Sequence, residues 1–298
     1  MEWITRNRKS HEGDAVNMSK PTPKTIATFE AKHGGGKIKK LEHELEVAAK
    51  KVEALAGVQN KVAIRPTKES TFTFALTGDR HTGSLYHHQA ALKAFYEYAA
   101  TQHVECVYDA GDILDGHRVY KGHEFELQDL GLEKQVDRLT ASAPRFIPTS
   151  FITGNHDASF KHAAGVPVGR IIEKAVGYKF LGEEQARIQY DTPNGPFSIM
   201  LLHSGSGSSY ALSYRPQKIV ESLEGGTKPD LLAIGHYHKA EMLPTYRNVC
   251  AIQVGTFQRQ TPFMARGGLA AHVGGWIVQV IVGNGHNVIK GEFVAFYV

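Results

Sequence analysis

Five groups of side chains that can bind metal ions each follow an apolar run of β-forming residues. Asp79 and His81 follow residues 71–77, Asp112 and Asp115 follow 104–110, Asn155, His156 and Asp157 follow 145–153, His203 follows 197–202, and His236 and His238 follow 230–234. Each polar group loses solvation energy on folding unless it finds a partner. Because the carboxyl ends of adjacent strands meet at one rim of an open α/β sheet, we expect the groups to converge. A pair of divalent metal ions is the simplest partner for so many ligands.

The types and spacing of these side chains restrict the metal site. Imidazole, carboxylate and carboxamide ligands without a thiolate suit manganese, iron or zinc, and they exclude a structural zinc site built from cysteines. In Asp79-x-His81 and His236-x-His238 the two ligands are two residues apart, so in an extended segment they point the same way. Glycines precede four of the groups and permit sharp turns and close backbone approach; they are Gly78, Gly111, Gly154 and Gly235.

The elements that must position these groups alternate between strand and helix patterns from residue 71 onward. Strand-like runs at 71–77, 104–110 and 145–153 are followed by helical patterns at 86–103, around 123–142 and at 168–176. Two strands around an Asn194-Gly195 turn, a helix around 210–224 and a strand at 230–235 come next, and the remainder is rich in β-formers. This order predicts an α/β fold, a four-layer α/β/β/α sandwich of two mixed β-sheets flanked by helices.

Residues 1–70 form a separate segment by composition, which we expect to be an N-terminal arm outside a catalytic domain at 71–298. The arm holds 14 basic and 9 acidic residues, a net charge of +5, which leaves −1 for the rest of a chain whose total is +4. Residues 38–56 space apolar side chains at helical intervals and predict an amphipathic helix. A homodimer through this helix is one expectation, and attraction of a polyanion by the basic residues is another.

Composition places the chain among ordinary globular proteins. It has 298 residues, 42% of them hydrophobic and 21% charged. Cys106 and Cys250 both lie inside apolar runs, which predicts buried free thiols of a reducing compartment and not a disulfide. No apolar run reaches the length of a membrane helix, and residues 1–14 lack the hydrophobic core of a signal peptide. We therefore expect a cytoplasmic protein with no membrane partner.

The ordered motifs D-x-H, G-D-x-x-D, G-N-H-D, a single histidine and G-H-x-H resemble those of the calcineurin-like metallophosphoesterase superfamily over roughly residues 72–260. The resemblance implies that Asp79, His81 and His238 hold one metal, that Asn155, His203 and His236 hold the other, and that Asp112 bridges both. It also implies that His156 faces the scissile phosphate with Asp115 as its orienting partner. The expected cofactors are two divalent metal ions, manganese first, with iron, zinc or magnesium as alternatives.

The resemblance implies a phosphoesterase in which both metals activate one water for in-line attack on phosphorus. The protein-phosphatase branch has G-D-x-x-D-R-G and G-N-H-E, whereas this chain has Gly116 in place of the arginine and Asp157 in place of the glutamate. These departures favour a phosphodiesterase, in the style of the recombination-type DNA exonucleases, and nucleic acid as substrate. Cations that could line a phosphate-binding groove are Arg80, Arg118, Lys239, Arg259 and Arg266.

Three hypotheses about the function remain open from the sequence. The first is a two-metal phosphodiesterase that acts as a nuclease. The second uses the same site on phosphomonoesters or on small and cyclic nucleotides. The third is a non-catalytic scaffold that binds nucleic acid through the basic arm, although the complete set of seven metal ligands argues against it.

Overall fold

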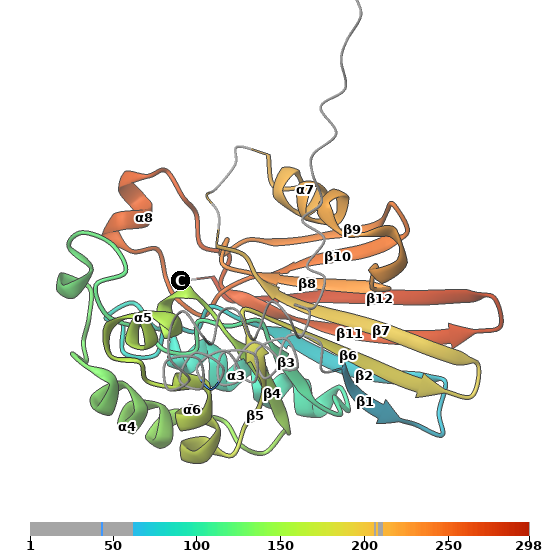
Figure 1. The fold of residues 1–298 in the computed structure, drawn as a ribbon, viewed down its shortest axis with the longest axis horizontal. Helices are drawn as coiled ribbons and strands as arrows, with labels where there is room; N and C mark the ends of the chain where they lie inside the picture. Colours follow the sequence, from blue (N-terminus) through green and yellow to red (C-terminus); the bar gives the residue numbers. More distant parts are fainter. Residues whose placement is uncertain (1–42, 44–61, 206, 208–210, 298) are drawn as a thin grey trace, which may run out of the picture. The chain divides into compact units, whose positions relative to one another are not determined.

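The computed structural model describes residues 43, 62–205, 207 and 211–297. The predicted helix at 38–56 and most of the predicted arm lie outside these residues. The described part contains two six-stranded sheets, each with parallel and antiparallel neighbours (Figure 1). The predicted α/β class with two mixed sheets and flanking helices is confirmed.

The first sheet carries three of the five polar groups at the ends of parallel strands. Its order is β12-β11-β2-β3-β4-β5, and β2 to β5 run parallel. The strands are β2 (Thr71–Thr77), β3 (Val107–Asp109), β4 (Thr149–Thr153), β5 (Lys179–Glu183), β11 (Gly274–Gly283) and β12 (His286–Ala295). Asp79, Asp112 and Asn155 therefore follow three adjacent strands.

The second sheet supplies the remaining two groups. Its order is β1-β6-β7-β8-β10-β9, and β7 and β8 are parallel neighbours. The strands are β1 (Val62–Pro66), β6 (Gln185–Thr192), β7 (Gly195–His203), β8 (Leu231–Gly235), β9 (Ala240–Tyr246) and β10 (Val249–Val254). His203 is the last residue of β7, and His236 follows β8 directly.

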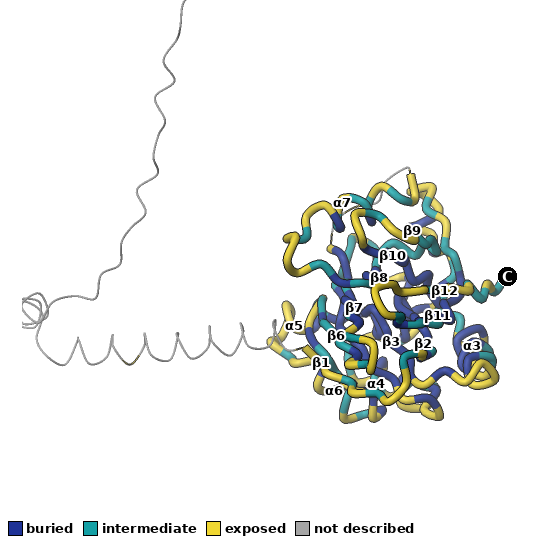
Figure 2. Tube along the Cα trace, turned by 90° about the vertical axis from the view of Figure 1, so that its right-hand side faces the viewer, coloured by how far each residue is buried: buried dark blue, intermediate teal, exposed yellow. Residues whose placement is uncertain are grey.

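Hydrophobic burial holds the layers together. One cluster lies between the sheets and joins side chains such as Phe74 and Tyr108 to Ile199 and Ile252. Helices cover the outer faces: α3 (Gln89–Thr101), α4 (Leu132–Ser142), α5 (Asn155–Ala164) and α6 (Val168–Val176) pack on the first sheet, and α7 (Tyr214–Ser222) packs on the second. Figure 2 shows the central strands buried and the exposed positions gathered on outer elements and loops.

Several predicted boundaries need correction. Strand β1 pairs in parallel with β6, so residues 62–66 belong to the sheet and not to an arm that ends at residue 70. The predicted helix around 123–142 is a short 3-10 turn, His123–Phe125, followed by α4. Helix α5, which begins at Asn155, was not predicted. The last helix, α8 (Pro262–Arg266), is short and begins with Thr261 as its cap.

Two expectations from composition can be compared with the structure. Cys106 and Cys250 are buried and free, as predicted. No helix within the described residues combines the length and the apolar character needed to cross a bilayer.

Candidate metal centre

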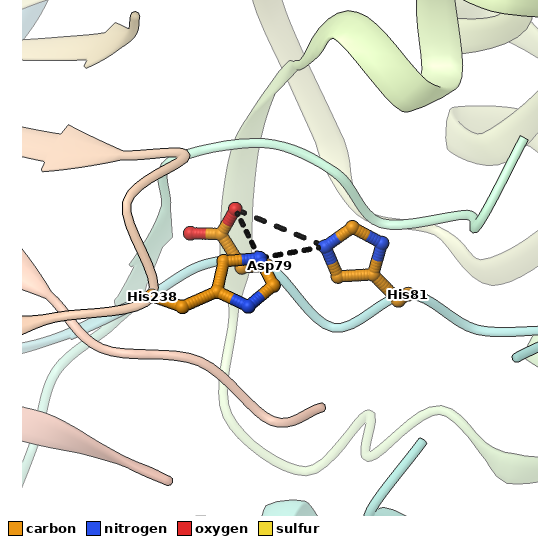
Figure 3. A group of neighbouring side chains, drawn as sticks. All are labelled: Asp79, His81 and His238. Atoms are coloured by element: carbon orange, nitrogen blue, oxygen red, sulfur yellow. Dashed lines mark hydrogen bonds and ion pairs between the residues drawn. The ribbon is translucent and has the colours of Figure 1, made fainter. Parts of the chain in front are cut away.

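Asp79, His81 and His238 form the first group of converging side chains (Figure 3). They come from the loop after β2 and the loop after β8. The Nε2 atoms of the two histidines are 3.0 Å apart, and Asp79 Oδ1 lies 3.5 Å from the His238 Nε2 and 4.0 Å from the His81 Nε2. Three potential donor atoms therefore face one small volume.

Asn155, His203 and His236 form the second group. Asn155 Oδ1 is 3.0 Å from the His203 Nε2 and 2.9 Å from the His236 Nδ1. The three residues come from the first turn of α5, the end of β7 and the loop after β8. Loops from both sheets therefore meet here, as the sequence pattern predicted.

Asp112 lies between the two groups. Its Oδ2 is 3.1 Å from the His203 Nε2 and 3.8 Å from the His81 Nε2. Its Oδ1 accepts a hydrogen bond of 2.8 Å from the backbone N–H of His156. The carboxylate is thus fixed by α5 and placed where it can serve both groups.

Hydrogen bonds behind two histidines aim their other nitrogens into the centre. His203 Nδ1 donates to the backbone carbonyl of Ala110 at 2.7 Å, and His81 Nδ1 donates to Asp115 Oδ1 at 2.9 Å. In each ring the remaining Nε2 then carries the lone pair that a metal requires. Asp115 was predicted to orient His156, but its carboxylate lies closer to His81 than to the His156 Nδ1, which is 3.5 Å away.

The backbone is held in an unfavourable conformation at five of the seven predicted ligands. Positive φ angles of 50°, 51° and 54° occur at Asp79, His81 and Asp112, and angles of 85° and 53° occur at His236 and His238. Such conformations cost free energy for residues with a side chain, and they concentrate at functional sites. The surrounding structure therefore fixes these side chains at an energetic cost.

Gly154 allows the closest approach in the centre. A Cβ atom at this position would lie 2.2 Å from Asp112 Oδ1 and 2.6 Å from His203 Cε1. Only glycine fits there, which explains the glycine before Asn155 that the sequence pattern singled out.

The pKa values show that, without a cation, protons on histidines balance the negative charge of the centre. Burial lowers the pKa of His203, but the charge of Asp112 outweighs burial and raises that pKa to about 10. Burial and the charge of His203 lower the pKa of His236 to about 4, and burial together with the charge of His156 lowers the pKa of His81. His81 and His236 are therefore neutral, and Asp112 attracts a proton to His203 in the absence of a cation.

His156 stands beside the two groups and faces the cavity above them. Its Nδ1 donates to the backbone carbonyl of Asp115 at 2.6 Å, which leaves Nε2 for a substrate. Burial lowers the pKa of His156, but the nearby charges of Asp112 and Asp115 raise it to about 9. The imidazolium is thus the expected form at neutral pH.

Two residues near the centre have roles that sequence reasoning missed. His123 is fully buried, and its Nε2 lies 3.4 Å from Asp115 Oδ2. Asp157 accepts hydrogen bonds from the backbone N–H groups of Ile113, Leu114 and Gly154, so it joins the loop after β3 to the start of α5. The G-N-H-D motif marked Asp157, whereas no spacing marked His123.

A cavity of about 390 Å³ opens above the centre. Five of the predicted ligands and His156 line one side of it: His81, Asp112, Asn155, His236 and His238. Tyr120 and Phe263 form an aromatic wall, with their rings stacked at 4.2 Å between centroids. Glu126 holds this wall, because it accepts from the Tyr120 hydroxyl at 2.7 Å and from the Phe263 N–H at 3.0 Å.

The predicted substrate-binding cations do not line this cavity, and Arg80 requires a correction. Arg80 is completely buried and ion-paired with Asp109 at 2.6 Å, so it is a structural residue and cannot reach a substrate. Lys239 donates to the backbone carbonyl of Ala270, Arg118 is exposed, and Arg259 lines a different cavity. Within the described residues, no lysine or arginine lines the cavity above the metal centre.

The donor set fits two divalent cations. Two groups of oxygen and nitrogen donors share one carboxylate, two of the imidazoles are neutral, and without a cation a proton on His203 balances the charge of Asp112. His238 Nε2 faces Asp79 Oδ1 at 3.5 Å, and the Nδ1 of the same ring is buried without a hydrogen-bond partner. Such a set suits manganese, iron or zinc better than calcium.

The calcineurin-like phosphoesterase family model matches residues 72–240. The chain therefore belongs to this family. The fold and the metal centre place it in the class of metal-dependent phosphoester hydrolases. No curated protein matches the chain.

Solved structures with a similar chain path share little sequence with this protein. GAP50, the anchor in the inner membrane complex of Plasmodium, is 14% identical with a TM-score of 0.46, over 76% of this chain and 84% of that one. A single mutant of Vps29 from Entamoeba histolytica is 17% identical, with a TM-score of 0.37 and coverage of 76% and 100%. A dimetal phosphatase from Danio rerio is 12% identical, with a TM-score of 0.37 and coverage of 75% and 98%.

Proposed function

We propose that the protein hydrolyses phosphodiester bonds in nucleotide substrates at a centre of two divalent metal ions, manganese first among them. The observation that carries the proposal is the position of Asp112 between two complete donor groups. Bound there, two metal ions would lower the pKa of a coordinated water and neutralise charge on the phosphoryl oxygens.

The residues of the chain would perform the remaining steps. Asp79, His81 and His238 would hold one ion, Asn155, His203 and His236 the other, and Asp112 both. His156 in its protonated form would donate from Nε2 a hydrogen bond to the phosphoryl oxygens or a proton to the leaving oxygen, because its Nδ1 already donates to the Asp115 carbonyl. Asp115 would keep His81 and His156 in place through its carboxylate and its backbone carbonyl.

The residues that line the cavity above the metal centre suit an organic leaving group of limited size. The stacked rings of Tyr120 and Phe263 offer a flat apolar face beside His156, and the centroids of Tyr120 and His156 are 6.3 Å apart. A nucleobase stacks well on such a face. The lack of cations among the described lining residues favours a cyclic mononucleotide or a short oligonucleotide over a long polyanion. The small-nucleotide diesterase is therefore the stronger of the two diesterase hypotheses.

A substrate panel tests this proposal. The full chain is assayed with manganese, magnesium and zinc on bis-p-nitrophenyl phosphate, its monoester, cyclic nucleotides, RNA, and single- and double-stranded DNA. We expect the diesters and nucleotides to be hydrolysed faster than the monoester. Exclusive turnover of the monoester would contradict the proposal, and turnover of long DNA in preference to small nucleotides would restore the nuclease hypothesis.

A matched pair of variants tests the centre itself. Asp112→Asn removes the shared carboxylate and should lower kcat by about 10³-fold or more. Asp137→Asn changes an exposed aspartate on α4 and should leave kcat unchanged. Equal activity of the two variants would refute the assigned centre, and bound metal with no hydrolysis of any substrate would favour the scaffold.

A further inference from the structure

A second cavity, of about 600 Å³, adjoins the metal centre through shared chain segments. His238, Gln258 and Leu269 line the metal cavity, whereas Ala240, Arg259 and His272, their close neighbours in sequence, line the second. The backbone N–H of His272 donates to the carbonyl of His238 at 2.9 Å. The second cavity is therefore built on the segments that position a predicted metal ligand.

Hydrogen-bond donors without acidic partners face this second cavity. Arg259 Nε is buried and makes no hydrogen bond, and no aspartate or glutamate is among the described lining residues. His272 Nδ1 accepts from the Ala240 N–H at 3.0 Å, so a neutral His272 ring carries its hydrogen on Nε2 and can donate. A guanidinium without a carboxylate partner in a concave site favours an anionic ligand, and phosphate matches its geometry.

Aromatic side chains also line the second cavity. Phe293, Phe296 and Tyr297 line the cavity, and Tyr297 is 96% exposed. Phe293 packs against Trp276 with 5.3 Å between ring centroids, and the Phe296 N–H is anchored on the Val273 carbonyl at 2.9 Å. Phe293 and Phe296 thus provide rings in the same cavity on which a planar group can stack.

We infer that this second cavity binds a nucleoside monophosphate, with the phosphate on Arg259 and the base against the aromatic wall. The combination of a guanidinium with no carboxylate partner among the described residues, one imidazole donor and several rings suits a ligand that is both anionic and planar. The volume of the second cavity, about 600 Å³, lies within the range of about 300–1,000 Å³ found for small-molecule sites. The preference for an anionic, planar ligand follows from the lining of the cavity alone. The choice of a nucleotide among such ligands rests on the proposed function.

Binding of adenosine monophosphate to the full chain in excess chelator tests the inference without hydrolysis. The fluorescence of Trp276, which packs against Phe293, reports binding in the second cavity, and calorimetry measures the affinity. We expect adenosine monophosphate to bind about tenfold more tightly than adenosine or inorganic phosphate alone, because each probe makes only part of the contacts. Arg259→Gln should weaken its binding about tenfold and leave adenosine binding unchanged. Arg247→Gln, on an exposed arginine, is the matched control.

Other outcomes would overturn the inference. If Phe263→Leu abolishes binding while Arg259→Gln does not, the nucleotide binds in the metal cavity and the second site is refuted. If Arg259→Gln does not fold, the salt dependence of the unaltered protein decides: added NaCl should weaken binding of adenosine monophosphate and not of adenosine. Equal salt dependence would refute the role of the guanidinium. Failure of hydrolysis would affect none of these results.

Discussion

At the residue scale, charge explains why these side chains can share one site. Asp79 and Asp112 are buried, and in the absence of metal their charge is balanced by protons on His203 and His156. Burial raises the pKa of both carboxyl groups, but nearby histidines outweigh it and keep both values below the ordinary range. These are His238 and His203 for Asp79, and His203 and His156 for Asp112. Cations would replace the proton on His203 and leave the carboxylates unchanged.

Metal affinity should therefore depend on pH. A histidine must lose its proton to bind a metal, and the pKa of His203 is raised to about 10 by Asp112 after burial has lowered it. Below that pH each binding event displaces this proton, so affinity should rise about tenfold per pH unit. Competition with a chelating dye between about pH 6 and pH 8 measures the slope. A slope of zero would contradict the assignment of His203 as a ligand.

The sequence predicted which residue types would gather, and it missed the residues that support them. Asp79, His81, Asp112, Asn155, His203, His236 and His238 lie together because each follows a strand. His123 belongs to no motif, because it lies in a short 3-10 turn between β3 and α4 whose position beside Asp115 leaves no regular spacing in the sequence. Arg80 was misassigned, since position beside a ligand does not reveal that its side chain turns inward to Asp109.

At the element scale, short loops after five strands determine the geometry of the centre. Helix α5 supplies Asn155 as its first residue, and the backbone N–H of His156 in the same turn holds Asp112. Asp157 joins this turn to the loop after β3 through three backbone N–H groups. The loops therefore support one another and would move together.

Gly154→Ala tests how closely these loops must approach. The new methyl group would collide with Asp112 Oδ1 and His203, and both side chains would have to move. We expect metal affinity to fall about 10–100-fold, as for other changes that displace ligands, with the fold retained by circular dichroism. Gly225→Ala, at an open position, is the control. Unchanged metal affinity in Gly154→Ala would show that the close approach is not required.

Strands with clear patterns were predicted well, and elements that depend on tertiary contacts were not. The run TFTFALT forms β2 over Thr71–Thr77 as predicted. Strand β1 is a five-residue strand at the edge of its sheet, so its pairing with β6 gave no signal of its own. Helix α5 begins with Asn-His-Asp, residues typical of turns, and exists because Gly154, Asp157 and Asp112 organise its first turn.

At the scale of the described domain, two sheets pack face to face, and their strand ends build one site. Arg80 ties the loop after β2 to the helical layer on the outer face of the first sheet. It pairs with Asp109 and donates to the hydroxyls of Tyr96 and Tyr178, which come from α3 and from the loop after α6. This buried network therefore joins the D-x-H loop to the surrounding elements.

Breaking this network should destabilise the protein strongly. Arg80→Met leaves Asp109 buried without its partner, which costs about 3–5 kcal/mol in the free energy of unfolding. Lys93→Met removes an exposed pair with Glu97 and should cost about 0–1 kcal/mol. Urea unfolding measures both. Equal effects of the two substitutions would show that burial of the Arg80 pair is not important for stability.

The central claim is that two cations share Asp112, and the metal content of the purified chain tests it most directly. Elemental mass spectrometry after loading with manganese and removal of free metal should give two ions per chain, and Asp112→Asn should bind fewer. Retention of only one ion by the unaltered chain, or equal content in both proteins, would contradict the account.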